Sequence, residues 1–175
     1  MATDIISYNG VNNYDFDKTI SINKINIIEG QGIKINRTIL ETKNIDILLD
    51  PQKNIKNDAL HFRKSGLTQI HCKIAARNDI CIGFSFNNIL NCQNKAKEMG
   101  RIMQNIRLCR KYKVKMIFAS FAKNKWELRS LSDLKSFAKV LGMTGMESNQ
   151  AFINIENLLK NKKIKWIKKG VKIIE

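Results

Sequence analysis

Short apolar runs alternate with amphipathic helical patterns along most of the chain, and this alternation is the feature that most limits the fold. Apolar runs with β-branched residues predict strands at residues 45–49, 80–86, 114–121 and 164–167. Periodic apolar residues with capping and stop signals predict helices at about 65–78, 95–112, 130–141 and 144–160. Strands and helices that alternate in this way are joined by right-handed βαβ crossovers into a parallel sheet. The periodicity leaves open whether that sheet is open or closed into a barrel.

Capping residues set the expected starts of three of the helices. Ser65 is the expected N-cap of the first, and Ser130 or Ser132 that of the third. Thr144 and Glu147 have the three-residue spacing of a capping box, in which each side chain accepts a hydrogen bond from the other residue's backbone.

The helix predicted at 95–112 has the clearest division into two faces. Its apolar residues fall within an arc of about 120° at 100° per residue. They are Met99, Ile102, Met103, Ile106 and Cys109. The opposite side carries Lys97, Arg101, Arg107 and Lys111. We therefore expect the apolar face to pack on the sheet and the basic face to be exposed.

The first 44 residues show weaker patterns. Ile20–Ile28 and Ile33–Leu40 are rich in isoleucine and are interpreted as strand material, with Gly30 and Gly32 between them. No linker or low-complexity tract separates this region from the rest. A chain of 175 residues with 43% hydrophobic content buries one sizeable core and is short for two domains. We expect a single domain over residues 1–175.

The charge is unevenly distributed. The chain has 31 Lys and Arg against 15 Asp and Glu, a formal net charge of +16. Residues 1–50 hold five bases and seven acids, so the remaining residues hold 26 bases and eight acids, a net +18. A compositional bias toward lysine explains part of this excess but not the local arginines. The distribution indicates a polyanionic partner.

Residues for protein-borne catalysis are scarce. The only histidines are His61 and His71, and neither belongs to a metal-binding pair. Asp46 and Asp50 flank an apolar strand, and the carboxyl end of such a strand is where α/β enzymes place reactive groups. Asp50 precedes Pro51, however, which favours a turn-forming role. His71 is interpreted as a satisfied, half-buried side chain, and we expect no catalytic and no metal-binding residue.

The cysteines are expected to be buried, reduced thiols. Cys72, Cys81 and Cys109 fall in apolar helical or strand positions, and the chain has no C-x-x-C pair. The sequence shows neither a signal segment nor a run of eighteen apolar residues. We expect a cytoplasmic protein without a membrane span.

Two basic regions are candidates for binding a polyanion. In Phe62–Gly66, Arg63 and Lys64 precede a predicted helix N-terminus, whose free N–H groups favour phosphate; a solvated loop is the alternative. The second region has six cations and no acid in residues 101–115, followed by three cations around Trp126. The candidate binding residues are Arg63, Lys64, Arg101, Arg107, Arg110, Lys111, Lys115, Lys123, Lys125 and Arg129.

Several long strings resemble a known family. They are "HFRKSGLTQIHCKIAARNDICIGFSFNNIL" (61–90), "GRIMQNIRLCRKYKVKMIFASFA" (100–122), "LRSLSDLKSFAKVLGM" (128–143) and "WIKKGVKII" (166–174). They resemble the archaeal form of ribonuclease P protein component 3, a family of protein subunits with a TIM-barrel-like (β/α) fold. The resemblance covers residues 46–143 most strongly.

The resemblance implies a protein subunit of the ribonucleoprotein that removes the 5′ leader from precursor tRNA. In that family the catalytic RNA hydrolyses the phosphodiester with bound Mg²⁺, and the protein itself binds no cofactor. The implied partners are ribonuclease P RNA, a small subunit with a ferredoxin-like fold and other ribonuclease P proteins, with precursor tRNA contacted indirectly. The isolated polypeptide is then not catalytic.

Individual residues carry the resemblance further. The family's His-x-Arg-Asn-Ser-Gly-Leu string is matched by His61, Arg63, Ser65, Gly66 and Leu67, and Lys64 replaces the asparagine. The resemblance also covers Gly100, Arg101, Arg107, Arg110, Lys111, Lys115, Ser120 and Arg129. By this alignment the family's first βα unit is absent here. We therefore expect an incomplete or distorted barrel, with its seam covered by loops or by a partner.

Two other functions remain as alternatives. A metal-dependent phosphoesterase of the polymerase-and-histidinol-phosphatase type has a related barrel, but it requires several His and Asp ligands at strand ends. A non-specific RNA-binding module would account for the charge alone. The first would cleave without RNA, and the second would not distinguish ribonuclease P RNA from other structured RNAs.

Overall fold

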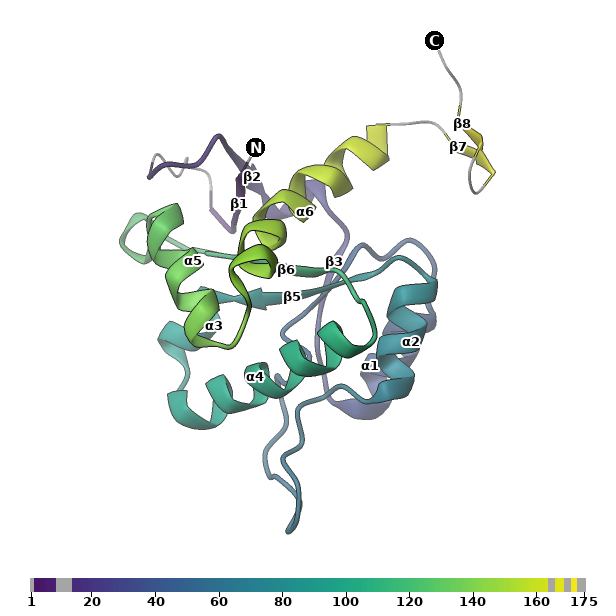
Figure 1. Cartoon of the computed structure of the whole chain (residues 1–175), viewed down its shortest axis with the longest axis vertical. Helices are drawn as coiled ribbons and strands as arrows, with labels where there is room; N and C mark the ends of the chain where they lie inside the picture. Colours follow the sequence, from purple (N-terminus) through teal and green to yellow (C-terminus); the bar gives the residue numbers. More distant parts are fainter. Residues whose placement is uncertain (1, 9–13, 164–165, 169–170, 173–175) are drawn as a thin grey trace.

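A computed structural model of the chain describes residues 2–8, 14–163, 166–168 and 171–172 (Figure 1). The described strands are β1 (Thr3–Ile6), β2 (Lys18–Ser21), β3 (Ile27–Glu29), β4 (Ile47–Leu49), β5 (Cys81–Ser85), β6 (Met116–Ala119), β7 (Trp166–Lys168) and β8 (Val171–Lys172). The helices are α1 (Ile33–Glu41), α2 (Gln69–Arg77), α3 (Phe86–Asn91), α4 (Lys95–Lys111), α5 (Leu131–Val140) and α6 (Gly145–Lys163). Single 3₁₀ turns occupy η1 (Ile22–Lys24) and η2 (Lys125–Glu127).

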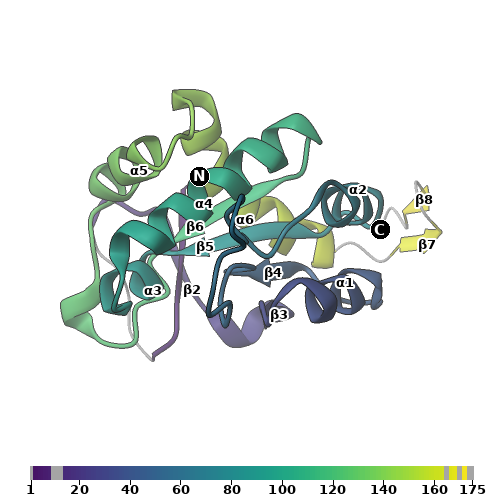
Figure 2. The ribbon, with the colours of Figure 1, turned by 90° about the horizontal axis from the view of Figure 1, so that it is seen from below.

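The centre of the molecule is a parallel sheet in the order β3-β4-β5-β6. Its side chains alternate between two cores, as strand geometry requires. Leu48, Ile82 and Phe118 point to the core shared with the surrounding helices. Ile47 and Ile117 point to a second core on the other side. Figure 2 shows α1, α2, α4 and α5 arranged around the outside of the strands.

The parallel pair β1 and β2 extends this arc without closing it. The Phe121 N–H donates to the Ile5 carbonyl and the Ser7 N–H donates to the Ala122 carbonyl, both at 2.8 Å, so β1 lies beside the chain that follows β6. Within the described part of the chain, β2 and β3 belong to different sheets. The expected α/β architecture with an incomplete barrel is confirmed. Helix α6 contributes Ile155 to the second core and covers part of that core.

Residues 33–41 form helix α1, so the strand predicted at Ile33–Leu40 is wrong. Asn36, Ile39 and Leu40 are buried at spacings of three and four, which only a helix places on one face. Ile35 is 46% exposed. The preference of isoleucine for strands is overridden here by packing against α2 and β4. In the other predicted segment, Ile20–Ile28, η1 separates β2 from β3.

Helix α2 begins three residues later than its predicted cap. Thr68, not Ser65, is the N-cap: its N–H donates to His71 Nδ1 at 3.1 Å, and its hydroxyl accepts from the His71 N–H at 3.5 Å. His71 Nε2 lies 2.9 Å from the Ile33 carbonyl oxygen, and burial lowers the pKa of the imidazole. These hydrogen bonds confirm that His71 is satisfied, and at 3% exposure the residue is fully buried rather than half-buried as predicted.

The caps of the later helices agree with the sequence. Ser130 accepts the Asp133 N–H at 3.1 Å at the start of α5. Thr144 and Glu147 exchange hydrogen bonds of 3.2 and 2.8 Å at the start of α6. The strand predicted at 164–167 lies partly outside the described residues, and β7 pairs antiparallel with β8. Within the described residues, no helix has the length and apolar character needed to cross a membrane.

Candidate nucleic-acid interface

Arg101 is a structural side chain rather than a surface cation. It is 4% exposed, and its Nε and Nη2 donate to Asp58 Oδ1 at 3.2 and 2.8 Å. Its Nη1 donates to the Ile55 carbonyl at 2.7 Å. The guanidinium therefore holds residues 55–58 against α4. The structure places Arg101 inside the protein, not on the exposed basic face predicted for it, because the loop between β4 and α2 covers this part of the helix.

Two more of the predicted cations take part in ion pairs within the protein. Arg110 binds both carboxylate oxygens of Glu147 at 2.7 and 2.6 Å and the Gly142 carbonyl at 2.6 Å. Arg110 thereby holds the pKa of Glu147 below its usual range and links α4 to the start of α6. Lys115 pairs with Asp79 at 2.6 Å. Both cations remain partly exposed, so their charges still contribute to the surface potential.

Five of the remaining predicted cations gather in two sets at the surface. Arg107 and Lys111 lie on the outer side of α4, as the helical pattern predicts. The second set surrounds Trp126, a residue that is 78% exposed. Lys125 Nζ lies 4.8 Å from the centre of that ring, a cation–π contact. Arg129 donates to the Trp126 carbonyl at 3.0 Å, and Lys123 is exposed beside this turn.

The Arg63–Lys64 pair lies in a loop and not at a helix N-terminus. Helix α2 begins at Gln69, and its capping box satisfies the Thr68 and His71 N–H groups, so the two cations do not immediately precede a helix N-terminus as predicted. Arg63 is exposed, and its guanidinium lies against Gly100 of α4, where a Cβ would come within 2.0 Å of Nη1. Glycine at position 100 therefore makes room for Arg63.

Gly66 allows the segment before α2 to approach the segment after β4 closely. It adopts a φ of +82°, and a Cβ at this position would lie 1.8 Å from the Pro51 carbonyl oxygen. Asn36 Nδ2 donates to the Pro51 and Gly66 carbonyls at 2.8 and 3.0 Å. The loop between β4 and α2 is thus pinned at its base, and Figure 1 shows it extending away from the body on the side opposite α6.

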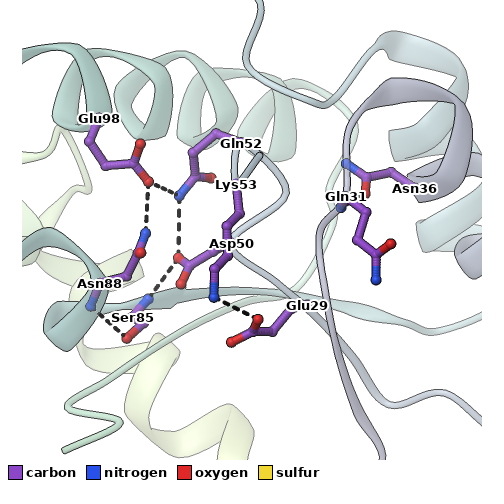
Figure 3. Close-up of polar contacts among 9 residues, drawn as sticks. All are labelled: Glu29, Gln31, Asn36, Asp50, Gln52, Lys53, Ser85, Asn88 and Glu98. Atoms are coloured by element: carbon purple, nitrogen blue, oxygen red, sulfur yellow. Dashed lines mark hydrogen bonds and ion pairs between the residues drawn. The ribbon is translucent and has the colours of Figure 1, made fainter. Parts of the chain in front are cut away.

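A buried polar network lies at the carboxyl ends of β4 and β5 (Figure 3). Asp50 is 2% exposed, and its Oδ1 accepts the Ser85 N–H at 3.0 Å and Gln52 Nε2 at 3.3 Å. Gln52 Nε2 also donates to Glu98 Oε1 at 2.9 Å, and Asn88 donates to the same oxygen at 2.7 Å. Glu98 from α4 is therefore connected to Asp50 through an amide.

Burial raises the pKa of the Asp50 carboxyl to about 7, although the hydrogen bonds from Ser85 and Gln52 act in the opposite direction. Asp50 has a φ of 46°, and its carbonyl accepts the Lys53 N–H at 2.9 Å, which confirms its role in a turn. The carboxyl borders a cavity of about 160 Å³ whose rim includes the Lys53–Glu29 ion pair, 2.6 Å between Nζ and Oε2.

The chemistry of this cavity is limited. In the ranges that the structure describes, no group of three or more His, Cys, Asp or Glu side chains is placed to hold a metal ion. The amides of Asn87 and Asn88 face other protein acceptors. Asp50 Oδ1 is used by Ser85 and Gln52, which fits a structural carboxyl better than a nucleophile or a general base. The strand-end position of Asp50 follows from the local sequence, whereas its burial depends on β5 and α4, which are distant in the chain.

Comparison with known proteins identifies the chain's relatives. The family model described as RNase P subunit p30 matches residues 4–166. Ribonuclease P protein component 3 of Methanosarcina acetivorans is 29% identical over 154 residues, covering 85% of this chain and 61% of the relative. The Methanococcus maripaludis (strain S2/LL) protein of the same name is 26% identical over 162 residues, covering 87% of this chain and 66% of the relative.

A solved structure shares the fold. One chain of the cryo-EM structure of archaeal ribonuclease P with mature tRNA superposes with a TM-score of 0.71 at 22% identity. The match covers 85% of this chain and 64% of that chain. The chain thus spans about three-fifths to two-thirds of the length of these relatives. The expected TIM-barrel-like fold is confirmed as an open arc of strands.

Proposed function

The chain belongs to the RNase P subunit p30 family, and from this membership we propose that it acts as a protein subunit of ribonuclease P, the ribonucleoprotein that removes the 5′ leader from precursor tRNA. The catalytic RNA hydrolyses the phosphodiester with the Mg²⁺ that it binds. The polypeptide supports the active RNA conformation by binding that RNA and a small ferredoxin-like-fold subunit. It binds no cofactor of its own and acts in the cytoplasm. Its precursor-tRNA contacts are indirect.

The observation that carries the proposal is the family match over residues 4–166, nearly the whole described chain. The net charge of +16 supports it, because an RNA partner is a polyanion. The metal-dependent phosphoesterase would require several His and Asp ligands at strand ends, and among the described residues no group of three or more His, Cys, Asp or Glu side chains is placed to hold a metal ion.

The RNA-facing cations in this proposal are those with exposed charge. Arg107, Lys111, Lys123 and Lys125 are exposed, and among the described residues no acidic side chain forms an ion pair with their side-chain cations. We also assign RNA contacts to Arg63 and Lys64, in the loop between β4 and α2, and to Arg129, which follows η2. Arg110 and Lys115 contribute through the potential of the surface. Each phosphate neutralised adds about 0.9 to the salt slope on a duplex and about 0.7 on a single strand.

Reconstitution tests the proposal directly. Precursor-tRNA cleavage by ribonuclease P RNA is measured at low Mg²⁺ with the small partner subunit, with and without this chain. Faster cleavage only with the complete mixture is the expected result. Cleavage by this chain without the RNA, abolished by a chelator, would instead support the phosphoesterase. Equal affinity for ribonuclease P RNA and an unrelated structured RNA at the same salt would support the non-specific module.

Charge reversal then tests the basic face. We expect Arg107→Glu with Lys111→Glu to weaken RNA association and flatten its salt dependence, because both side chains lie outside the ion pairs that hold the fold together. The matched control is Lys73→Glu with Lys34→Glu, which makes the same charge change on exposed positions of α2 and α1. Equal losses in both double variants would mean that only net charge matters. Circular dichroism confirms that each variant is folded.

A further inference from the structure

The loop between β4 and α2 ends in an exposed apolar turn. The Ala59 N–H donates to the Phe62 carbonyl at 3.0 Å and closes the turn at residues 59–62. Leu60 is 90% exposed and Phe62 is 62% exposed, although neighbouring residues of the same loop are partly buried. Burying either side chain elsewhere would be favourable, so their exposure at the end of a projecting loop indicates a contact surface.

The stem of this loop is held in place by α4. Arg101 makes three hydrogen bonds to Asp58 and Ile55, and Lys97 Nζ donates to the Lys56 carbonyl at 2.8 Å. The Lys64 N–H closes the stem from the other side by donating to Asp58 Oδ1 at 3.1 Å. These bonds fix the position of the turn before any partner arrives, which lowers the entropic cost of binding.

The charge of the turn's surroundings is positive. Between residues 53 and 64 the only acid is Asp58, which pairs with Arg101. Lys56 and Arg63 are exposed on either side of the turn, and His61 is exposed within it. An aromatic ring flanked by cations on a rigid loop matches the way proteins hold unpaired RNA bases, by stacking the base and contacting its phosphates. A protein partner with an acidic surface would need only the cations, and one with an apolar surface would need only the apolar side chains.

We propose that residues 59–63 form a stacking platform for one unpaired nucleotide of a structured RNA, with the base on the Phe62 ring and the adjoining phosphates near Lys56 and Arg63. The inference rests on the proposed function, since it names the part of that RNA which this loop binds: a bulge, loop or single-stranded end. A fully paired helix offers no free base face to the ring. The Arg101–Asp58 pair, in which the arginine is buried, then has a role in positioning, because it holds the platform out from the body.

The test uses the full chain, fluorescently labelled ribonuclease P RNA, and two short blunt-ended RNA duplexes, one fully paired and the other identical except for one bulged nucleotide. We expect Phe62→Ala to weaken binding of ribonuclease P RNA and of the bulged duplex by about 5- to 150-fold, the range for loss of one base–aromatic stack. Binding of the fully paired duplex stays unchanged. Phe62→Trp restores or strengthens binding. Met146→Ala, which removes an apolar side chain that is 85% exposed on α6, is the matched control and binds like the unaltered chain.

The salt dependence of binding distinguishes base stacking on Phe62 from phosphate contacts by Arg63. Phe62→Ala keeps the slope of log K against log salt, whereas Arg63→Ala lowers it by about 0.7 to 0.9. If Phe62→Ala binds all three RNAs like the unaltered chain but no longer captures the small partner subunit, the platform binds protein and the inference is overturned. Failure of the unaltered chain to bind ribonuclease P RNA would overturn the proposed function itself. Equal losses of RNA affinity in Phe62→Ala and Met146→Ala would also overturn the inference.

Discussion

Replacing Asp50 by asparagine should stabilise the protein at neutral and alkaline pH. The carboxyl is 2% exposed, and burial raises its pKa to about 7 from 3.8. In the described part of the chain the carboxyl accepts hydrogen bonds from Ser85 and Gln52, both at Oδ1, so an asparagine keeps them through its own Oδ1. Its Nδ2 then takes the place of Oδ2. The φ of 46° is also one that asparagine adopts readily.

The magnitude follows from the pKa. The folded-state pKa lies above the unfolded value, so the folded protein binds this proton more tightly than the unfolded chain. The stability that comes from binding this proton is therefore fully present below the unfolded-state pKa, and it is lost as the pH rises through the folded-state pKa. A shift of about three units corresponds to about 4 kcal/mol, of which about 3 kcal/mol is lost between about pH 5 and pH 8.

Urea unfolding of the unaltered chain and of Asp50→Asn at about pH 5 and pH 8 measures this difference. Asp79→Asn is the matched control, because Asp79 also has a positive φ of 57° but its side chain is 60% exposed. The difference in free energy of unfolding between Asp50→Asn and the unaltered chain should increase by about 3 kcal/mol from the lower pH to the higher. The corresponding difference for Asp79→Asn should change little. An Asp50→Asn protein whose relative stability is the same at both pH values would refute the argument.

Two further substitutions test the base and the stem of the projecting loop. Gly66→Ala should cost about 3 kcal/mol or more in urea unfolding, because a Cβ there lies 1.8 Å from the Pro51 carbonyl oxygen in addition to the strain of a positive φ. Gly142→Ala, with a φ of +98° and no atom within 4 Å of the new Cβ, should cost only about 1 to 2 kcal/mol, so equal costs would remove the argument for a close approach. Arg101→Met should cost about 2 to 3 kcal/mol by leaving Asp58 without its partner. It should also speed amide hydrogen exchange in residues 55–58, and unchanged exchange there would mean that the ion pair does not hold the loop.

Local patterns in the sequence determined the alternation of strands and helices after residue 45. Ser130, Thr144 and Glu147 act within one helical turn, so their capping roles follow from spacing alone. The two faces of α4 are equally local, because a period of 3.6 residues fixes which side chains point to the sheet. The scarcity of histidine and of paired carboxylates was likewise visible without coordinates.

Contacts between distant residues decided what the sequence left open. Arg101 occupies the polar side of α4, yet a segment 43 to 46 residues earlier folds over it and removes its charge from the surface. Asp50 is buried by β5 and α4, whose residues in the network are 35 to 48 positions away, with Gln52 joining it to Glu98. Residues 33–41 became a helix because α2 and β4 offer a surface to Ile39 and Leu40. Periodicity describes one element at a time, whereas the burial of a charge depends on which other elements the chain brings beside it.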